Sequence, residues 1–292
     1  LRAPSLHTLV QWLGLSVCSS WLLLSTTNYI CRDVASIPLL WILPLTLFLI
    51  SYIIAFSPRP FYSRRWCIVL FFITTAAVSY AHFNVVPLVV TVLASLGALF
   101  FGCMLCNGEL ATLKPAPTHL ALFYFITAVG GALGSTFVSI AAPALFADYV
   151  EFPLGFELCA LLMLVRLLET DRVFQRTPRI AWSAISVAAI VCTVVTISLE
   201  QQGASLISKR SFYGVTRVRE AQDRLGNVRR EFYHGSILHG LQYVREPHRP
   251  TAYFEPHSGI ARTLRALQVV ITLLAIAAMG TLWAVYQIVS QR

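Results

Sequence analysis

Charged residues are scarce in this 292-residue sequence. Asp, Glu, Lys and Arg make up only 12% of it, whereas a soluble domain carries about 25%. Hydrophobic residues make up 57%, and the mean hydropathy is +0.70. Apolar runs of about 20 residues recur along most of the chain, and each can cross a hydrocarbon core about 30 Å thick. This composition excludes a soluble enzyme, a secreted disulfide scaffold and a disordered tail, and it indicates a polytopic membrane protein.

The motifs of common enzyme classes are absent from the sequence. It has no P-loop, no His-Glu-x-x-His, no nucleophile elbow and no Gly-x-Gly turn between a strand and a helix. Cys103 and Cys106 form a lone C-x-x-C, which we interpret as helix packing. Four histidines, at 234, 239, 248 and 257, have spacings that match no metal site. We therefore predict no catalytic residue, metal site or cofactor, and we lean against an enzyme; bound lipids are expected.

Eight apolar spans can be recognised, and a membrane-crossing segment must be helical because its backbone groups find no other hydrogen-bond partners. They are approximately 8–30, 37–56, 66–83, 85–106, 119–146, 152–168, 180–199 and 267–289. The expected fold is an all-α polytopic membrane protein with seven or eight transmembrane helices, divided into a seven-helix domain (1–199) and a C-terminal helix (267–292). Pro44 lies inside the second span, where we expect it to kink the helix.

Residues 200–266 have a different composition, with eleven Lys or Arg and six Asp or Glu. Apolar and polar residues alternate over 211–221 and again over 228–233, on either side of a turn-forming segment at 223–227. This pattern predicts an antiparallel hairpin. A module of about 65 residues has a marginal core of its own. We therefore expect a small extramembrane β module that rests on the helices or on a partner.

The positive charges of the short loops predict the orientation of the chain. With a cytoplasmic N-terminus, ten Lys or Arg fall on the inner side, whereas the outer short loops hold only Arg32. We thus expect a multi-pass protein of the bacterial inner membrane, with both termini cytoplasmic and residues 200–266 periplasmic. The net charge of +9 fits cytoplasmic retention and contact with anionic lipids, so we predict no nucleic-acid partner.

Two acidic residues and one glycine-rich stretch stand out in the apolar spans. Glu109 and Glu157 are intramembrane or interfacial acids, a residue class that marks function by default. Lys114 is a possible partner for Glu109, and we see no buried basic partner for either acid, so a capping or interfacial role is favoured over transport. In the fifth span, small residues on one face predict close helix packing; they are Gly130, Gly131, Gly134 and Ser135.

Three blocks of sequence, at 26–45, 108–151 and 210–259, occur in the order found in one family. They include Ile-Pro-Leu-Leu-Trp at 37–41, Lys-Pro-Ala-Pro-Thr-His at 114–119 and Ser-Phe-Tyr-Gly-Val at 211–215. Together they resemble bacterial fused proteins in which a polytopic, transporter-like membrane region precedes a spermidine-synthase-like domain. The match covers the membrane region and the N-terminal β segment. The glycine-rich turn of that family's Rossmann-like catalytic domain is not found here.

The same resemblance marks a possible ligand site in the β module. His239, Gly240 and Gln242 resemble a segment that lies near the polyamine or the donor in aminopropyltransferases, although that segment has Asp where His239 stands. Tyr253, in the third block, completes this possible ligand-binding set. The competing interpretation, which we favour, is a tight turn in which Gly240 supplies backbone freedom.

Three functions remain open from the sequence. The first is a non-catalytic integral-membrane accessory or scaffolding subunit of a larger complex, with membrane lipids and other integral-membrane subunits as partners. The second is a transporter of a small cation or polyamine. The third is a membrane-bound aminopropyltransferase whose catalytic half lies on another chain or was not observed. We favour the first, because the donor-binding motif is not present and acids deep in the spans are lacking.

Overall fold

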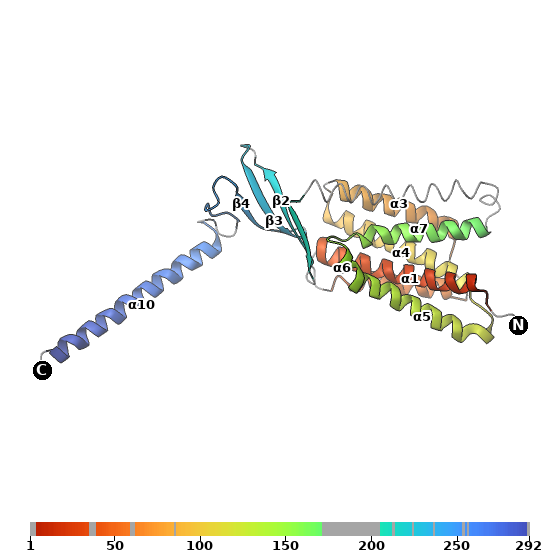
Figure 1. The fold of residues 1–292 in the computed structure, drawn as a ribbon, viewed down its shortest axis with the longest axis horizontal. Coiled ribbons are helices and arrows are strands. Elements are labelled where there is room, and N and C mark those ends of the chain that lie inside the picture. The colour runs from red at the N-terminus through yellow and green to blue at the C-terminus, as the bar shows by residue number, and fades with distance from the viewer. Residues whose placement is uncertain are drawn as a thin grey trace. The chain divides into compact units, whose positions relative to one another are not determined.

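The computed structural model describes most of the chain, and Figure 1 shows its course. The described residues are 4–34, 39–58, 62–84, 86–170, 205–211, 214–223, 225–235, 237–252, 255 and 257–290. The chain forms two compact units. One comprises Leu1–Arg217 with His234–Ser236, and the other comprises Val218–Tyr233 with Ile237–Arg292.

Helices dominate the first unit. They are α1 (Leu6–Asn28), α2 (Ile42–Phe56), α3 (Arg64–Phe83), α4 (Leu88–Thr112), α5 (Leu120–Thr136), α6 (Ala142–Leu145) and α7 (Glu151–Thr170). Short π-helical segments extend α1 (Tyr29–Val34) and join α5 to α6 (Phe137–Ala141), and a 3-10 turn (Pro117–His119) precedes α5. The second unit contains one long helix, α10 (Gly259–Ser290).

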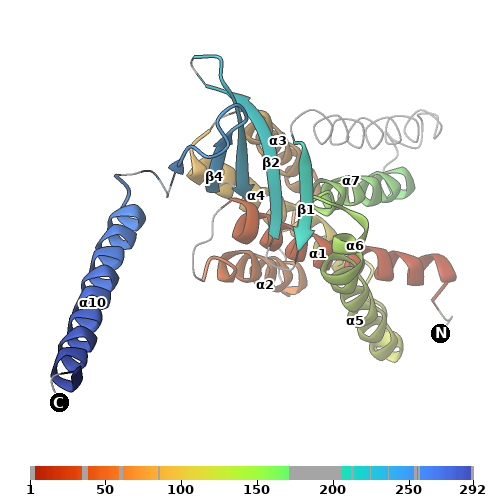
Figure 2. The ribbon, with the colours of Figure 1, turned by 60° about the vertical axis from the view of Figure 1, so that its left-hand side comes forward.

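Helices α1 and α4 form the centre of the first unit. Each contacts the other as well as α2 and α7, and α5 packs on α1 while α3 packs on α4. Every residue of α4 from Gly102 to Leu110 is buried, as expected of a helix covered on all sides. Trp12 and Phe123 are fully buried nearby, with their rings edge to face at 5.1 Å. Figures 1 and 2 show the neighbouring helices running alongside this pair.

Glycines of α5 allow its backbone to approach α1 closely. A Cβ atom added to Gly134 would overlap the carbonyl oxygen of Val17, and one added to Gly130 would lie 2.8 Å from the carbonyl oxygen of Leu13. Gly131 faces the Ser20 hydroxyl instead, at 3.2 Å from the added Cβ. The partner of the small-residue stretch predicted from the sequence is therefore α1 of the same chain.

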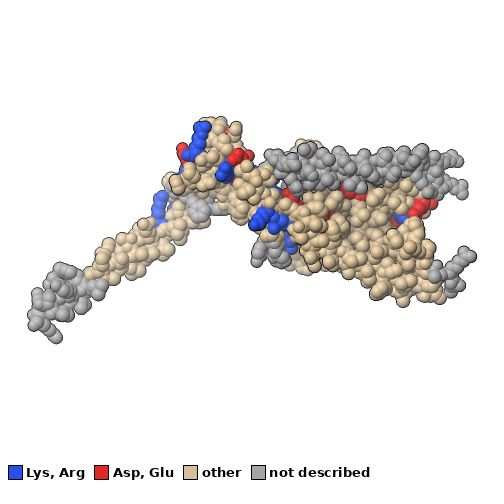
Figure 3. Space-filling model, in the orientation of Figure 1, with Lys and Arg blue, Asp and Glu red and all other residues tan. Residues whose placement is uncertain are grey.

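Five described helices are long and apolar enough to cross a membrane, which is compatible with a multi-pass membrane protein. They are Leu6–Arg32, Arg64–His82, Leu88–Thr112, Pro117–Leu145 and Gly259–Met279. In Figure 3, residues other than Lys, Arg, Asp and Glu cover most of the described helical surface in view.

The described residues contain fewer membrane-crossing helices than the seven or eight that the sequence predicts. Helix α2 has 15 residues, about 22 Å of helix. Helix α7 is long enough but carries Glu151, Glu157, Arg166 and Glu169. The predicted span 180–199 lies outside the described residues. The predicted kink at Pro44 is wrong, because α2 begins only at Ile42 and a proline in the first turn removes no helical hydrogen bond.

Four strands form one antiparallel sheet in the order β1-β2-β3-β4. Their bounds are β1 (Ile207–Ser211), β2 (Gly214–Gln222), β3 (Val228–His234) and β4 (Ile237–Tyr243). The hairpin predicted around 223–227 is present between β2 and β3. The Asp223 carboxylate accepts hydrogen bonds from the backbone N–H groups of Leu225 and Asn227 at 2.8 and 2.9 Å. Gly226 has a positive φ of 80°, which glycine adopts without steric cost.

Candidate functional site

A buried carboxylate, Glu109, lies near the C-terminal end of α4 and is surrounded by basic groups. Its side chain is fully buried, and both of its oxygens are occupied. Arg64 of α3 donates from Nε to Oε1 at 2.5 Å and from Nη2 to Oε2 at 2.6 Å. Arg166 of α7 donates from Nε to Oε2 at 3.1 Å, and the Tyr62 hydroxyl donates to Oε1 at 2.9 Å. We call Tyr62, Arg64, Glu109 and Arg166 the Glu109 cluster.

The polar network continues from the Glu109 cluster to the start of α1. Arg166 also pairs with Glu169 at 3.1 Å, and Glu169 accepts a hydrogen bond from Gln11 at 2.7 Å. His7 lies 2.8 Å from the second carboxylate oxygen of Glu169. The network therefore connects α1, α3, α4 and α7 at one end of the first unit, which we call the helical unit.

Opposite charge explains how Glu109 remains in the interior. An isolated buried carboxylate is costly, and it persists only where charged partners and hydrogen bonds satisfy it. Burial, and then the neighbouring Glu109 carboxylate, raise the pKa of Tyr62, so its hydroxyl keeps the proton that it donates. A Cβ atom on Gly108 would lie 2.5 Å from the Tyr62 ring. Glycine at 108 thus makes room for this donor.

The pairing of Glu109 differs from the sequence interpretation. Lys114 was the suggested partner, whereas the structure pairs Glu109 with Arg64 and Arg166. The expectation that neither acid has a buried basic partner was wrong for Glu109, because Arg166 is only 8% exposed. Glu157, the other predicted acid, lies in α7 with a half-buried side chain.

A second group of charges, one pair of them buried and one pair half-buried, lies at the opposite end of α7. Arg210 of β1 holds the fully buried Glu151 through two hydrogen bonds, Nη2 to Oε1 at 2.6 Å and Nη1 to Oε2 at 2.9 Å. Arg217 of β2 binds both oxygens of Asp148, at 2.6 and 3.1 Å. The Arg210 guanidinium also lies 4.7 Å from the centre of the Tyr149 ring. We call Asp148, Glu151, Arg210 and Arg217 the Glu151 cluster.

The Glu151 cluster attaches the first strands to the helices. Paired N–H groups of arginine match the two oxygens of a carboxylate, which gives both strength and a fixed orientation. Backbone groups take part as well, since Arg210 donates to the carbonyl oxygen of Asp148 at 2.8 Å. The Trp21 indole of α1 donates to the Glu151 carbonyl oxygen at 2.7 Å. Strand β1 and the beginning of β2 are therefore held in one fixed position on the helical unit.

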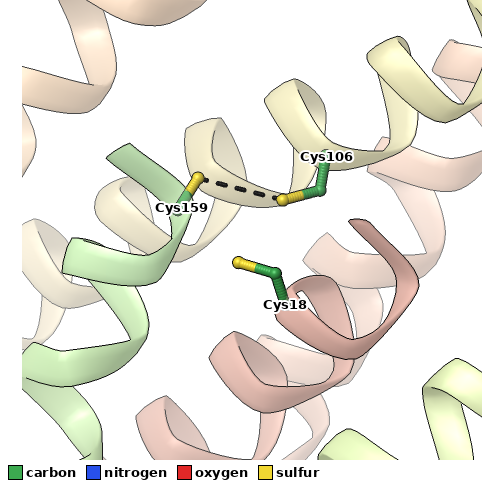
Figure 4. A group of neighbouring side chains, drawn as sticks. All are labelled: Cys18, Cys106 and Cys159. Carbon is green, nitrogen blue, oxygen red and sulfur yellow. Dashed lines mark hydrogen bonds between the residues drawn. The ribbon is translucent and has the colours of Figure 1, made fainter. Parts of the chain in front are cut away.

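Three cysteines converge in the interior of the helical unit (Figure 4). They are Cys18 of α1, Cys106 of α4 and Cys159 of α7, and all three are fully buried. Their sulfur atoms lie within 4.8 Å of one another, and the Cys106 and Cys159 sulfurs are 3.8 Å apart. Sequence spacing gave no sign of this group, because only Cys106 belongs to a local cysteine motif. We call these residues the thiol cluster.

The possible ligand residues of the β module lie partly together. Gly240 and Gln242 of β4 line a shallow hollow with four other residues, Val218, Arg230, Phe232 and Leu241. The Gln242 amide donates to the Pro247 carbonyl oxygen at 3.2 Å, and the ring of His239 lies 6.2 Å from that of Phe232. Tyr253 lies outside the described residues. Gly240 lies within a strand, not in the tight turn that we favoured.

Comparisons of the chain with protein-family models, with curated proteins and with solved structures find no match. The resemblance to fused membrane and spermidine-synthase-like proteins therefore stays a prediction.

Proposed function

We propose that this chain is a non-catalytic integral-membrane subunit that holds a β sheet at the membrane surface for a larger membrane complex. The observation that carries the proposal is the Glu151 cluster. Two bidentate arginine–carboxylate pairs fix β1 and the start of β2 to the first turn of α7 and to the loop that precedes it. A fixed attachment of this kind suits a protein that presents a surface to a partner.

The two charge clusters also support a rigid helical unit. They lie at opposite ends of α7, where Arg166 follows Glu151 by 15 positions, or about 22 Å of helix. The close contact between α5 and α1 at Gly130 and Gly134 adds a third fixed point. A unit fixed at both ends and along its length suits scaffolding.

In this proposal the protein lies in the bacterial inner membrane with both termini in the cytoplasm. Arg64 and Arg166 would then be on the cytoplasmic side, where positive residues accumulate. Residues 200–266 would be periplasmic, and the charged Glu151 cluster would lie at the outer surface. Lipids would cover the exposed apolar helix faces, and other membrane subunits would be the partners.

Transport of a small cation or polyamine is the second proposal, and the Glu109 cluster argues against it. A cation would need a free carboxylate, yet both oxygens of Glu109 already bind arginines. Flux measurements on proteoliposomes, with wild type and Glu157→Gln, decide this point. Substrate flux that Glu157→Gln abolishes would replace scaffolding with transport, and wild-type flux no greater than that of protein-free liposomes would remove the transport proposal.

An aminopropyltransferase with its catalytic half elsewhere is the third proposal. It requires a Rossmann-like partner chain or a longer product from the same gene. Incubation of the native membrane fraction with a decarboxylated S-adenosylmethionine donor and an amine tests it. Product formation that disappears when this chain is depleted would favour the enzyme.

Native mass spectrometry of protein extracted in mild detergent from its own membrane tests the scaffolding function. We expect an assembly well above the 32.4 kDa of the chain, with other polypeptides in a fixed ratio. A lone monomer or a homo-oligomer would contradict the proposal.

A further inference from the structure

The thiol cluster has the composition of a soft-metal site. Thiolate sulfur binds Cu(I), Zn(II) and iron–sulfur clusters in preference to hard cations. Cys18, Cys106 and Cys159 come from three different helices, so their convergence does not follow from any local sequence motif. We propose that the thiol cluster binds one Cu(I) ion through three sulfur ligands. This inference is independent of the scaffolding function.

The distances between the sulfur atoms fit a metal at their centre. A metal–sulfur bond is about 2.3 Å long, so three sulfurs arranged trigonally around one ion lie about 4.0 Å apart. The Cys106 and Cys159 sulfurs are already 3.8 Å apart, and all three lie within 4.8 Å of one another. Side-chain adjustments of a few tenths of an ångström would bring each sulfur to bonding distance.

The number of donors favours Cu(I) over zinc. Structural zinc sites are almost always four-coordinate and tetrahedral. Among the residues that the structure describes, the converging group offers three donor atoms, all of them sulfur. Three soft ligands in a fully buried site, shielded from water, suit a soft ion of low coordination number.

The three thiols are positioned by packing and by weak hydrogen bonds. Cys18 points toward the Gly155 carbonyl oxygen at 3.9 Å, and Cys159 toward that of Gly102 at 3.7 Å. Binding forms three copper–sulfur bonds and breaks three S–H bonds; the three protons leave to solvent, so the loaded site carries a net charge of −2. No electron is transferred, because the ion enters as Cu(I) and remains Cu(I).

Cys103 provides a matched control within the same helix. It is as fully buried as Cys106 and lies one turn away on α4, but its sulfur faces the Ser19 carbonyl oxygen at 3.8 Å. It does not belong to the converging group. If copper bound to any buried cysteine, Cys103 would contribute to binding. In the proposed site it does not.

The test is the copper content of the full chain produced in copper-supplemented cells and purified without oxygen in mild detergent. We expect one copper per chain in the wild type and in Cys103→Ala, and at least a tenfold loss in Cys106→Ala and Cys159→Ala. X-ray absorption at the copper edge should show three sulfur neighbours at about 2.3 Å. A wild type without copper, or equal loading of all variants, would overturn the proposal, as would zinc retained in preference to copper.

A second measurement covers variants that fold poorly. Because a ligand that binds only the folded state stabilises it, copper should raise the thermal unfolding midpoint of wild type and Cys103→Ala. It should leave the midpoint of Cys18→Ala unchanged. The same rise in all three proteins would contradict a site made of these thiols.

Discussion

Arg210 and Glu151 meet through two parallel hydrogen bonds, of 2.6 and 2.9 Å, and their side chains are only 3% and 0% exposed. One residue belongs to a strand and the other to the first turn of α7. The pair therefore joins two kinds of secondary structure within one compact unit. Its energetic role can be measured, because removing one partner leaves the other charge buried and unpaired.

Arg210→Gln should destabilise the helical unit. Loss of one member of a buried ion pair costs about 3–5 kcal/mol, and here it leaves Glu151 without its bidentate donor. Thermal unfolding in detergent should show a lower midpoint, and hydrogen exchange in β1 should accelerate. The control is Arg230→Gln, because Arg230 and Glu220 are 52% and 42% exposed and such pairs contribute about 0.2–1 kcal/mol. Equal effects of the two variants would show that the Glu151 cluster is not a stabilising attachment.

Glu109→Gln should destabilise the folded protein more when it is made alone than when it is combined with Arg166→Met. The single change removes the carboxylate partner of Arg64 and one of the two carboxylate partners of Arg166, at a cost of about 3–5 kcal/mol. Replacing Arg166 as well removes one of these charges, so the effects should be non-additive by about 0.5–3 kcal/mol. Unfolding measurements on the two single variants and the double variant give this coupling energy. Strict additivity would mean that the two side chains do not interact.

Gly134→Ala should separate α5 from α1, whereas Gly131→Ala should be tolerated. The new methyl group at 134 meets the Val17 backbone, which cannot rotate away. At 131 it meets the Ser20 hydroxyl, which can change rotamer. Overpacking typically costs about 1–3 kcal/mol, so the unfolding midpoint should fall for Gly134→Ala only. A fall of the same size in both variants would refute a backbone contact specific to Gly134.

Gly226→Ala tests the hairpin turn through its backbone alone. No atom lies within 4 Å of the added methyl group, and the positive φ of 80° is the sole source of strain. Such a conformation costs a non-glycine residue about 1–2 kcal/mol, and asparagine tolerates it better than alanine. Hydrogen exchange in β2 and β3 should therefore be fastest in Gly226→Ala and intermediate in Gly226→Asn. If Asn and Ala behave alike, the turn conformation is not what constrains this hairpin.

Periodicity predicted much of the local structure. The apolar run at 85–106 corresponds to α4, and the alternating residues on either side of Asp223 correspond to the β2–β3 hairpin. Both patterns arise from residues that lie close together in the sequence, so they can be recognised without knowing the fold. The start of α2 was placed too early, because residues 37–41 are as apolar as the helix that follows them.

The sequence could not predict the charge clusters or the thiol cluster, because their members come from segments that lie far apart in the sequence. Arg166 lies near the end of the predicted span 152–168, but the apolar pattern does not show that α7 buries it against Glu109. Glu109 pairs with Arg64, which lies 45 positions earlier in the sequence, and not with the nearby Lys114. Cys18 and Cys159 meet only because α1 and α7 pack together. Contacts between helices depend on packing that the period of a single helix does not encode.

Native mass spectrometry of three proteins, each extracted from the native membrane, tests scaffolding most directly. Wild type and Arg230→Gln should both appear in an assembly with other polypeptides in a fixed ratio. Arg210→Gln should lose those polypeptides, because its first strand is no longer fixed to α7. A wild type that runs alone at 32.4 kDa, or as copies of itself, would contradict the account.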